Sequence, residues 1–320
     1  MSNRFPFPIP NGWFAIGFSH ELQPGDVKPV RYFGRDLVLF RDADGDAHLL
    51  DAFCPHLGAH LGHGGVIEGK EIVCPFHAWR FDGTGTCTKI PYSDKIPRQA
   101  SLERFKLVEA NNTLYAWHHL EGAEPDWEVP VFSECAPDND EFSEFVFRQW
   151  TVKTCNQEMA ENAVDTAHFM YLHGTAEMPK TSAKIINSHH MHATSTTKMS
   201  TKYGPVDGQI DVNMYGFGIN TTRFTGLVET FLISSNTPVD ENTCELRFSF
   251  TVKKFGDTDI TRGIGRAFIK EISRQLEQDI PVWENKVYLR RPVLCDGDGP
   301  IGLFRVWAKN MYCTEPTAAR

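Results

Sequence analysis

Two short segments decide the fold of the N-terminal half: Cys54-Pro-His56 and, after 17 intervening residues, Cys74-Pro-Phe-His77. Each segment carries one Cys and one His. Two thiolates and two neutral imidazoles can hold zinc, or a [2Fe-2S] centre in which one iron takes both Cys and the other takes both His. The alternation favours the cluster, because each segment then gives one ligand to each iron. The ligand set alone leaves zinc open.

Glycine and proline residues surround these four side chains. Glycine lets a backbone wrap closely round a bound group, and proline stiffens the loop. They are Pro55, Gly58, Gly62, Gly64, Gly65 and Pro75. We expect His60 and His63 to be surface residues or neighbours of the ligands, since four ligands complete a cluster. The six other Cys, at 87, 135, 155, 244, 295 and 313, lack ligand spacing and are expected to be small buried side chains.

Short strands extend on both sides of the two segments. Apolar runs predict strands at 13–18, 27–33, 36–41, 47–53, 71–73, 79–81 and 113–117. Asp44-Gly45 and Asp82-Gly83 lie between such runs as hairpin turns. Residues 118–140 are acidic and contain prolines, which indicates an exposed connection. We therefore expect an all-β domain over residues 1–125 and a second domain over 126–320.

The second half mixes helices and strands. The pattern predicts a helix at about 155–172, a strand-rich region at about 183–254 and an amphipathic helix at about 264–284. Alternating apolar positions within the strand-rich region indicate a sheet with one buried face. These positions are Met214, Phe217, Phe224, Leu227, Phe231 and Ile233. The fold class is α+β.

Composition excludes several classes of protein. The chain has 320 residues with 41% hydrophobic content, enough for real cores. Its 32 Lys and Arg against 41 Asp and Glu leave a net charge of -9, which suits neither nucleic acid nor an anionic membrane. No apolar run is long enough to span a membrane, and the first residues do not resemble a signal peptide. We expect a cytoplasmic protein with reduced cysteines.

A second cluster of polar residues lies in the predicted helix at 155–172. Glu161, Asp165 and His168 are spaced i, i+4 and i+7, so an ideal helix places them in one stripe, with Asn162 beside it. Because the rest of this helix is largely apolar, burying an ionisable stripe is costly unless something binds it. A solvated polar face with unrelated histidines is the plainer alternative.

His168 and His173 are candidate ligands of a second metal. They stand five residues apart, which is about 140° round an ideal helix. Both can reach one metal only if the helix widens into a π-bulge or ends between them with Gly174 as its cap. Two His side chains begin a 2-His-1-carboxylate triad, which leaves open positions on non-haem Fe(II) for O2.

The carboxylate of such a triad must come from elsewhere in the chain. In the helix at 264–284, Asp279 continues an apolar stripe, so its carboxylate faces the core and needs a partner. Pro281 removes an N–H donor, and we expect the helix to bend near Asp279. Glu277 and Glu284 lie off the stripe and are the weaker candidates.

The first half resembles the Rieske iron-sulfur domain on its two Cys and His segments. It lacks the additional Cys that respiratory Rieske proteins carry in each loop, so it resembles the oxygenase type. Together with Asn162-x2-Asp165-x2-His168-x4-His173 and Asp279, the whole chain resembles the catalytic subunit of the Rieske non-haem iron oxygenases. The resemblance implies a Rieske domain followed by a helix-grip catalytic domain, an antiparallel sheet with helices.

The same resemblance implies roles for the site residues. Cys54, His56, Cys74 and His77 would hold the [2Fe-2S] cluster. One mononuclear Fe(II) would be held by His168, His173 and Asp279, with Asn162 nearby. Asp165 would bridge the iron site to a Rieske His of a neighbouring subunit, which implies a homotrimer.

Within that family, the chain resembles two steroid-directed groups, the oxygenase component of 3-ketosteroid 9α-hydroxylase and the sterol 7-desaturases. The resemblance rests on the two Cys and His segments, on Ile-Pro-Tyr-Ser-Asp-Lys-Ile-Pro at 90–97, and on Glu-Asn-Ala-Val-Asp-Thr-Ala-His-Phe at 161–169. It implies a monooxygenase that hydroxylates a bulky apolar substrate, a steroid, with O2 as co-substrate. Electrons would come from NAD(P)H through a separate reductase or ferredoxin.

Other functions stay open at this point. The same ligands serve oxygenases that act on aromatic or other small substrates by dihydroxylation, O- or N-demethylation or desaturation. A Rieske electron-transfer protein would need no second metal. A zinc-binding interaction module would use the first four ligands alone.

Overall fold

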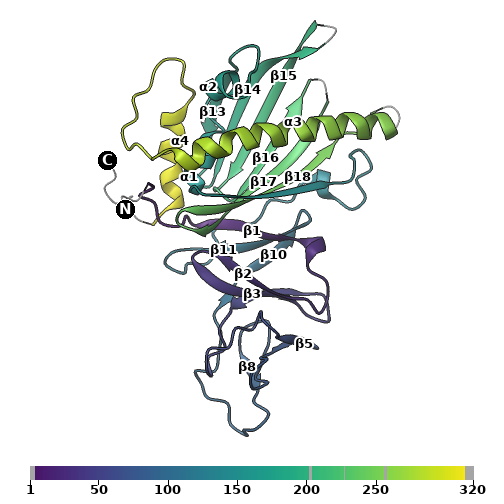
Figure 1. The fold of residues 1–320 in the computed structure, drawn as a ribbon, viewed down its shortest axis with the longest axis vertical. Helices are drawn as coiled ribbons and strands as arrows, with labels where there is room; N and C mark the ends of the chain where they lie inside the picture. Colours follow the sequence, from purple (N-terminus) through teal and green to yellow (C-terminus); the bar gives the residue numbers. More distant parts are fainter. Residues whose placement is uncertain (1–3, 202–203, 227, 256–257, 314–320) are drawn as a thin grey trace. The chain divides into compact units, whose positions relative to one another are not determined.

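The computed structural model describes residues 4–201, 204–226, 228–255 and 258–313 (Figure 1). The chain divides into two compact units. One comprises Ala15–His118 with Glu128–Val131. The other comprises the N-terminal stretch that ends at Phe14, His119–Trp127 and the chain from Phe132 onward. A domain boundary at residue 125 stays a prediction.

The first unit is built from short antiparallel strands, as expected. Its sheets have the orders β1-β11-β10, β2-β3-β4-β9 and β5-β6-β7-β8. The strands are β1 (Gly12–Phe18), β2 (Val27–Tyr32), β3 (Arg35–Arg41), β4 (Ala47–Asp51), β5 (Val66–Glu68), β6 (Glu71–Val73), β7 (Arg80–Phe81), β8 (Cys87–Lys89), β9 (Arg104–Phe105), β10 (Leu107–Ala110) and β11 (Thr113–His118). The sequence pattern missed β5, β8, β9 and β10, although it predicted the equally short β6 and β7. Both expected turns join neighbouring strands.

The core of this unit encloses both cysteines of the predicted cluster site. Cys54 and Cys74 pack in one buried group with Phe40, Leu61 and Trp79, among others. The two sulfurs therefore lie on the inner side of their loops. The apolar core of the domain and the inner wall of the candidate site are built from the same side chains.

The second unit is a seven-stranded antiparallel sheet with a long helix across it (Figure 1). The strand order is β12-β18-β17-β16-β15-β14-β13. The strands are β12 (Val146–Val152), β13 (Lys180–Ile185), β14 (His190–Thr201), β15 (Gly204–Tyr215), β16 (Ile219–Thr225), β17 (Thr230–Asp240) and β18 (Thr243–Val252). The helices are α1 (Asn156–Glu161), α2 (Ala167–Tyr171), α3 (Thr258–Asn285) and α4 (Ile301–Ala308). The second unit also contains the short 3-10 turns η2 (Ser133–Cys135) and η3 (Lys309–Met311), and a third, η1 (Ser19–Glu21), lies in the first unit. This is the expected helix-grip arrangement.

The face of the sheet under α3 follows the period of two that a strand imposes. Phe224, Leu232 and Phe248 pack there against Leu276 of α3. The expectation of a single buried face is wrong, because Phe231 and Ile233 are buried on the opposite face with Phe142.

Two positions of the alternating pattern do not belong to that sheet face. Phe217 lies in the turn between β15 and β16, where it packs on Trp307. Leu227 lies outside the described residues. Phe217 is buried as its apolar character suggested, but it lies in a turn and not in the strand that the pattern assumed.

The helix expected at 155–172 is wrong as a continuous element. α1 ends at Glu161 and α2 begins at Ala167, with turns between them. Asp165 Oδ1 accepts hydrogen bonds from the N–H groups of Ala167 (3.0 Å) and His168 (3.4 Å), so Asp165 caps α2 instead of continuing a helix.

The stripe of Glu161, Asp165 and His168 therefore does not form. Glu161 instead pairs with Arg305 of α4 through two hydrogen bonds of 2.6 and 2.9 Å. Both carboxylate oxygens are used in this pair, which leaves Glu161 without a role at a metal. The buried charge on α1 is satisfied by a partner from a distant segment.

The cysteines of the described part of the chain are free thiols. All eight cysteines lie there, and none forms a disulfide. Of the six cysteines without ligand spacing, Cys87, Cys155 and Cys244 are buried as expected. Cys295 is exposed, and Cys135 and Cys313 are half-buried, so the expectation is wrong for these three. Among the described helices, none combines the length and the apolar character that crossing a bilayer requires.

Candidate active site and cluster-binding loops

The two loops that carry the Cys and His segments share one backbone geometry. In each, the Cys carbonyl accepts a hydrogen bond from the N–H four residues later, Gly58 to Cys54 at 2.9 Å and Ala78 to Cys74 at 3.0 Å. Both donor residues are left-handed, with φ of 75° at Gly58 and 55° at Ala78. Glycine adopts this conformation freely, whereas alanine does so at a cost. The second loop thus repeats the first with a strained residue.

The cysteines of these loops are buried and the histidines reach the surface. Cys54 and Cys74 are 2% and 3% exposed, whereas His56 and His77 are half-exposed. The two imidazole rings lie close together, with centroids 4.7 Å apart. His56 also stacks on Trp79. Pairing sulfur with sulfur and imidazole with imidazole is what a two-iron centre with unlike irons needs.

Burial keeps the Cys54 thiol protonated unless a cation is bound beside it. Burial, with the neighbouring Cys74 thiol, raises the pKa of Cys54 to about 12. A buried thiolate pair is unfavourable without a cation, while a metal deprotonates its thiol ligands outright. The inward-facing sulfurs therefore fit an iron-sulfur cluster.

Two glycines of the first loop, Gly62 and Gly65, are required by close packing within the protein. A Cβ on Gly65 would lie 2.2 Å from the carbonyl oxygen of Leu61, and one on Gly62 would lie 2.8 Å from the Pro29 backbone. These contacts explain why both positions need glycine, and the expectation that their backbone wraps round a bound group stays a prediction. His60 Nδ1 accepts a hydrogen bond from the Gly62 N–H at 3.0 Å. His60 thus braces the loop as a neighbour of the ligands.

The second candidate site brings together His168, His173 and Asp279. Each offers one ligand atom, and these atoms lie within 4.8 Å of one another. His173 Nε2 and Asp279 Oδ2 are 3.5 Å apart. One metal ion can reach three donors at such spacing, since metal bonds to nitrogen and oxygen are about 2.0–2.2 Å long.

The expected irregularity between the two histidines is confirmed. α2 ends at Tyr171, and the N–H groups of Leu172 (2.8 Å) and His173 (3.2 Å) both donate to the His168 carbonyl. The second bond spans five residues, as in a π-turn. Gly174 follows with φ of 77° and closes the helix end. The widened turn lets both rings face one point.

Burial and hydrogen bonding prepare these three side chains for a metal. His173 and Asp279 are 9% and 7% exposed. Burial alone would lower the pKa of His173, but the Asp279 carboxylate and Gln278 together raise it. Gln278 Oε1 lies 3.2 Å from His173 Nδ1, so it can accept a hydrogen bond from a protonated Nδ1 and leave Nε2 facing Asp279. His168 Nδ1 is buried and has no hydrogen-bond partner within the described residues.

Of the three candidate carboxylates, the structure places Asp279 beside the histidines. Glu277 is exposed on the other side of α3. Glu284 Oε1 accepts a hydrogen bond from the Lys153 N–H at 3.2 Å. Pro281 lies within α3, and a bend of the helix there stays a prediction.

Asp165 and Asn162 lie on either side of this site. Asp165 Oδ2 is 3.7 Å from His168 Nδ1. Burial would raise the pKa of Asp165, but the contact with His168 outweighs it and lowers the pKa. Asn162 Oδ1 accepts a hydrogen bond from Trp283 Nε1 at 3.3 Å, and its side chain lines the cavity described next.

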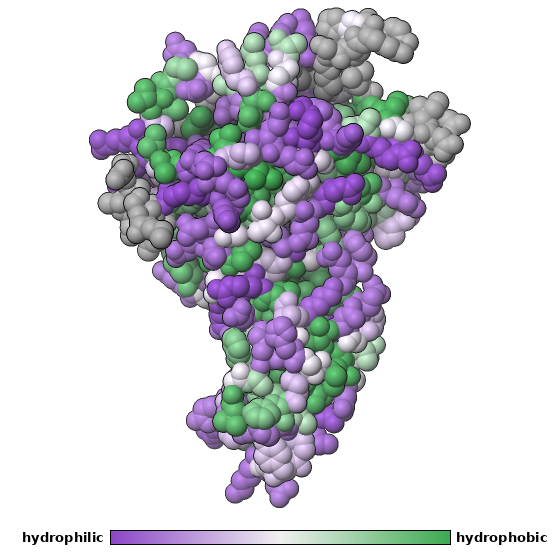
Figure 2. Space-filling model, in the orientation of Figure 1, coloured by the Kyte–Doolittle hydropathy of each residue, from purple (hydrophilic) through white to green (hydrophobic). Residues whose placement is uncertain are grey.

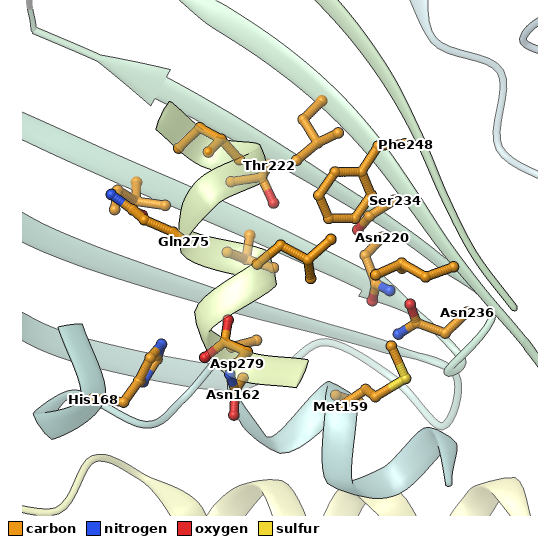
Figure 3. Close-up of a pocket in the computed structure, with 18 of the residues that line it drawn as sticks. Met159, Asn162, His168, Asn220, Thr222, Ser234, Asn236, Phe248, Gln275 and Asp279 are labelled. Carbon is orange, nitrogen blue, oxygen red and sulfur yellow. The ribbon is translucent and has the colours of Figure 1, made fainter. Parts of the chain in front are cut away.

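A cavity lies between the sheet and α3, with the two histidines and Asp279 in its wall (Figure 3). Its volume is about 190 Å³, without the open space at its mouth. Most of the lining is apolar. Its larger apolar members are Met159, Phe169, Ile210, Val212, Phe224, Leu232, Leu246, Phe248, Ile272, Leu276 and Trp283.

Five polar residues that line the cavity were not identified from the sequence; four of them lie on the sheet face that forms the floor of the cavity. They are Asn220 and Thr222 of β16, Ser234 and Asn236 of β17, and Gln275 of α3. The four strand residues stand at alternate positions, so they share the face that carries Phe224 and Leu232. Polar residues at inward positions of otherwise apolar strands are the signal that could have found them.

Both halves of the chain match known families. Residues 12–106 match the Rieske [2Fe-2S] domain. Residues 116–312 match the 3-Ketosteroid 9alpha-hydroxylase C-terminal domain. A zinc-binding module and a stand-alone electron carrier are not favoured, because neither accounts for the second match.

Curated relatives match along nearly the whole chain. It is 31% identical to cholesterol 7-desaturase nvd 1 of Ciona intestinalis, over 98% of this chain and 70% of that protein. It is 30% identical to a 3-ketosteroid-9-alpha-monooxygenase, oxygenase component, of Rhodococcus rhodochrous, over 96% of this chain and 82% of that protein.

Solved structures show the same fold. NdmA of Pseudomonas putida CBB5 with caffeine superposes with a TM-score of 0.76, at 18% identity, over 96% of each chain. Dicamba monooxygenase bound to dicamba superposes with a TM-score of 0.69, at 18% identity, over 94% of this chain and 96% of that one. With a [2Fe-2S] cluster and a mononuclear iron as its cofactors, the chain belongs to the Rieske non-haem iron oxygenases, in the family of the 3-ketosteroid 9α-hydroxylase C-terminal domain.

Proposed function

We propose that this chain is the oxygenase component of a monooxygenase that hydroxylates a C–H bond of a steroid or sterol. The observation that carries the proposal is the match of residues 116–312 to a steroid hydroxylase domain. The largely apolar cavity beside His168, His173 and Asp279 supports it, because a bulky apolar substrate gains free energy from leaving water.

The residues that would hold the two cofactors follow from the geometry. Cys54 and Cys74 would hold one iron of the cluster, and His56 and His77 the other. A further group, His168, His173 and Asp279, would hold the mononuclear iron. When bound, that iron supplies the reductive activation of O2, with electrons from the cluster.

The protein's own side chains prepare the site for this chemistry. Asp165 holds the His168 end of α2 through its cap and its contact with the ring. Gln278 orients the His173 ring. The apolar walls exclude water from the reacting C–H bond, which limits unproductive reactions.

Electrons would enter on the exposed side of the cluster loops. The rings of Phe76 and Tyr92 lie beside that of His77. Figure 2 shows hydrophobic patches over the part that carries β5 and β8. The exposed members are Phe53, Leu57, Val66, Phe76 and Tyr92. Such patches are typical of interaction sites. We propose that an NAD(P)H-dependent reductase or a ferredoxin docks here.

The proposed bridge role of Asp165 requires a second copy of the chain. Asp165 is partly exposed, so one side of its carboxylate is accessible to a neighbouring subunit. We propose a homotrimer in which Asp165 of one chain meets a cluster histidine of the next. The molar mass of the purified protein in solution tests this assembly. The cytoplasm stays the expected compartment.

Turnover by the purified protein tests the proposed reaction. The reconstituted protein is supplied with a generic reductase, NAD(P)H and O2, together with a panel of steroids, sterols and aromatic acids. We expect a steroid or sterol product that gains one oxygen atom, identified by mass. Oxygenated aromatic acids without any steroid product would overturn the substrate and leave the iron chemistry intact.

Desaturation is the second candidate reaction, because a relative of 31% identity is a cholesterol 7-desaturase. It uses the same ligands and the same electrons. A product that loses two hydrogen atoms and gains no oxygen identifies it in the same assay.

A further inference from the structure

Two buried carboxamides on the cavity floor have unsatisfied oxygens. Asn220 of β16 and Asn236 of β17 are 7% and 6% exposed, and both line the cavity. The Oδ1 atom of each is buried and has no hydrogen-bond partner in the part of the chain that the structure describes. A buried acceptor without a partner is unfavourable, and native proteins rarely retain one without a reason.

The positions of these carboxamides are fixed by the sheet. Asn220 lies opposite Ser234 in the register of β16 and β17. The backbone of Asn236 is held from the other side, since Asn156 Nδ2 donates to its carbonyl oxygen at 2.6 Å. The main chain of Asn236 is therefore satisfied while its side chain is left for something in the cavity.

Apart from Thr222 and Ser234 on the same sheet face, the cavity near the pair is lined largely by apolar side chains. Met159, Leu246 and Trp283 line the same cavity. A hydrogen bond in such surroundings discriminates strongly between ligands, because an unmatched polar group is not compensated by water. The two unsatisfied carboxamide oxygens in this largely apolar cavity indicate a ligand with a hydrogen-bond donor at one end.

The pair lies apart from the candidate metal ligands. Figure 3 shows Asn220 and Asn236 together on one side of the cavity and His168 on the other, with Asp279 nearer to His168. A ligand that touches both sides must extend across the floor. Its polar end then lies away from the carbon that reacts.

We propose that Asn220 and Asn236 anchor the alcohol group of an elongated apolar substrate, and so select a sterol alcohol over the matching ketone. This inference rests on the proposed function and specifies its substrate. A hydroxyl donates its proton to one carboxamide oxygen and accepts from the NH2 group of the other. A ketone can only accept, and it leaves both Oδ1 atoms unsatisfied.

Equilibrium binding tests the anchor without turnover. The reconstituted holoenzyme is titrated with two ligands of one steroid skeleton that differ only in a terminal hydroxyl or ketone. Quenching of tryptophan fluorescence reports binding, since Trp283 lines the cavity. We expect the alcohol to bind about tenfold more tightly, which corresponds to one charge-neutral hydrogen bond.

Near-isosteric variants locate the preference. Asn220→Leu and Asn236→Leu should each bring the alcohol-to-ketone ratio of dissociation constants close to one. The matched control is Thr222→Val on the same face of β16, which should change the affinity for both ligands by the same factor. Far-UV circular dichroism checks that each variant is folded.

The outcomes separate the anchor from the proposed function. Equal binding of alcohol and ketone by the unaltered protein overturns the anchor and leaves the steroid hydroxylase intact, and it needs no variant. An unchanged alcohol-to-ketone ratio of dissociation constants in both leucine variants also overturns the anchor, because the preference then does not depend on either carboxamide. If neither steroid binds, the anchor and the steroid substrate fail together.

Discussion

The cluster loops and the second metal site both hold candidate metal ligands, but they differ in how the chain positions these ligands and in how far solvent reaches them. Four candidate cluster ligands lie on two loops of matching backbone geometry, and their histidines reach the surface. In the second site, His168 and His173 come from one helix end, Asp279 comes from α3, and the three face a cavity. A centre that only carries electrons needs access for a donor. A centre that activates a substrate needs walls that exclude water.

The difference predicts what each site depends on. The cluster loops depend on local backbone conformation, so a single left-handed residue matters there. The second site depends on α3 and α1 packing correctly against the sheet, so distant ion pairs and neighbours of the ligands matter there. Variants directed at each dependence can break or sharpen the comparison.

Removing one proposed ligand of the second site should have the largest effect. Asp279→Ala should abolish turnover and lower the iron content by one atom per chain, because two histidines alone hold Fe(II) weakly. The visible absorbance of the cluster should persist. Metal analysis and absorbance spectra check both. The control is Glu277→Ala, because Glu277 lies two residues before Asp279 on α3 and is exposed. A full iron content in Asp279→Ala would contradict the assignment.

Breaking the ion pair between Glu161 of α1 and Arg305 of α4 should have a smaller effect on activity but should lower the stability of the whole second unit. Arg305→Met leaves Glu161 with an uncompensated, mostly buried charge and should lower the free energy of unfolding by about 3 kcal/mol. Denaturant unfolding measures it. The exposed pair of Arg274 and Glu271 provides the control, and Arg274→Met should leave the free energy of unfolding nearly unchanged, because solvent screens an exposed pair. Equal costs for the two variants would refute this role of the buried pair.

Removing the acceptor beside His173 should weaken metal binding without abolishing it. Gln278→Leu frees the imidazole to change its orientation, and we expect iron affinity to fall about 10–100-fold. Competition with a chelator measures the affinity. Gln278→Glu keeps an acceptor at the same place and should retain more of it. If the leucine variant binds iron as tightly as the unaltered protein, Gln278 does not position the ring.

The smallest expected effects test the matching cluster loops. Gly58→Ala meets no steric contact within 4 Å, so only its left-handed φ opposes the change. It should cost about 1 kcal/mol of stability. Ala78→Gly should relieve the same strain and stabilise the second loop by up to about 1 kcal/mol. Thermal unfolding checks both, and shifts of the same sign in the two variants would show that the loops are not equivalent.

The sequence was informative wherever function depends on residue type at short spacing. The two Cys and His segments indicated a two-iron site, and the five-residue spacing of His168 and His173 required the helix irregularity that the structure shows. Asp279 was identified because a carboxylate on an apolar stripe needs a partner. Each of these arguments uses only neighbours along the chain.

The same local reasoning failed where a side chain had two possible partners. A continuous helix at 155–172 satisfies the pattern, yet Asp165 caps α2 and Glu161 pairs with Arg305. Hydrogen bonds to a nearby backbone and to a distant guanidinium outweigh intrinsic helix preference, which is worth less than about 1 kcal/mol per residue. The pattern also could not show that β17 is buried on both faces.

The sequence by itself determined the two-part organisation, the candidate ligands and the family. Only the tertiary structure decided which residues share a cavity, since Met159, Asn236 and Gln275 come from three elements, α1, β17 and α3, that lie far apart along the chain. The physical reason is that a metal ligand is recognised by its own chemistry. A pocket residue is defined by what surrounds it, and burial without a partner is visible only after the chain has folded.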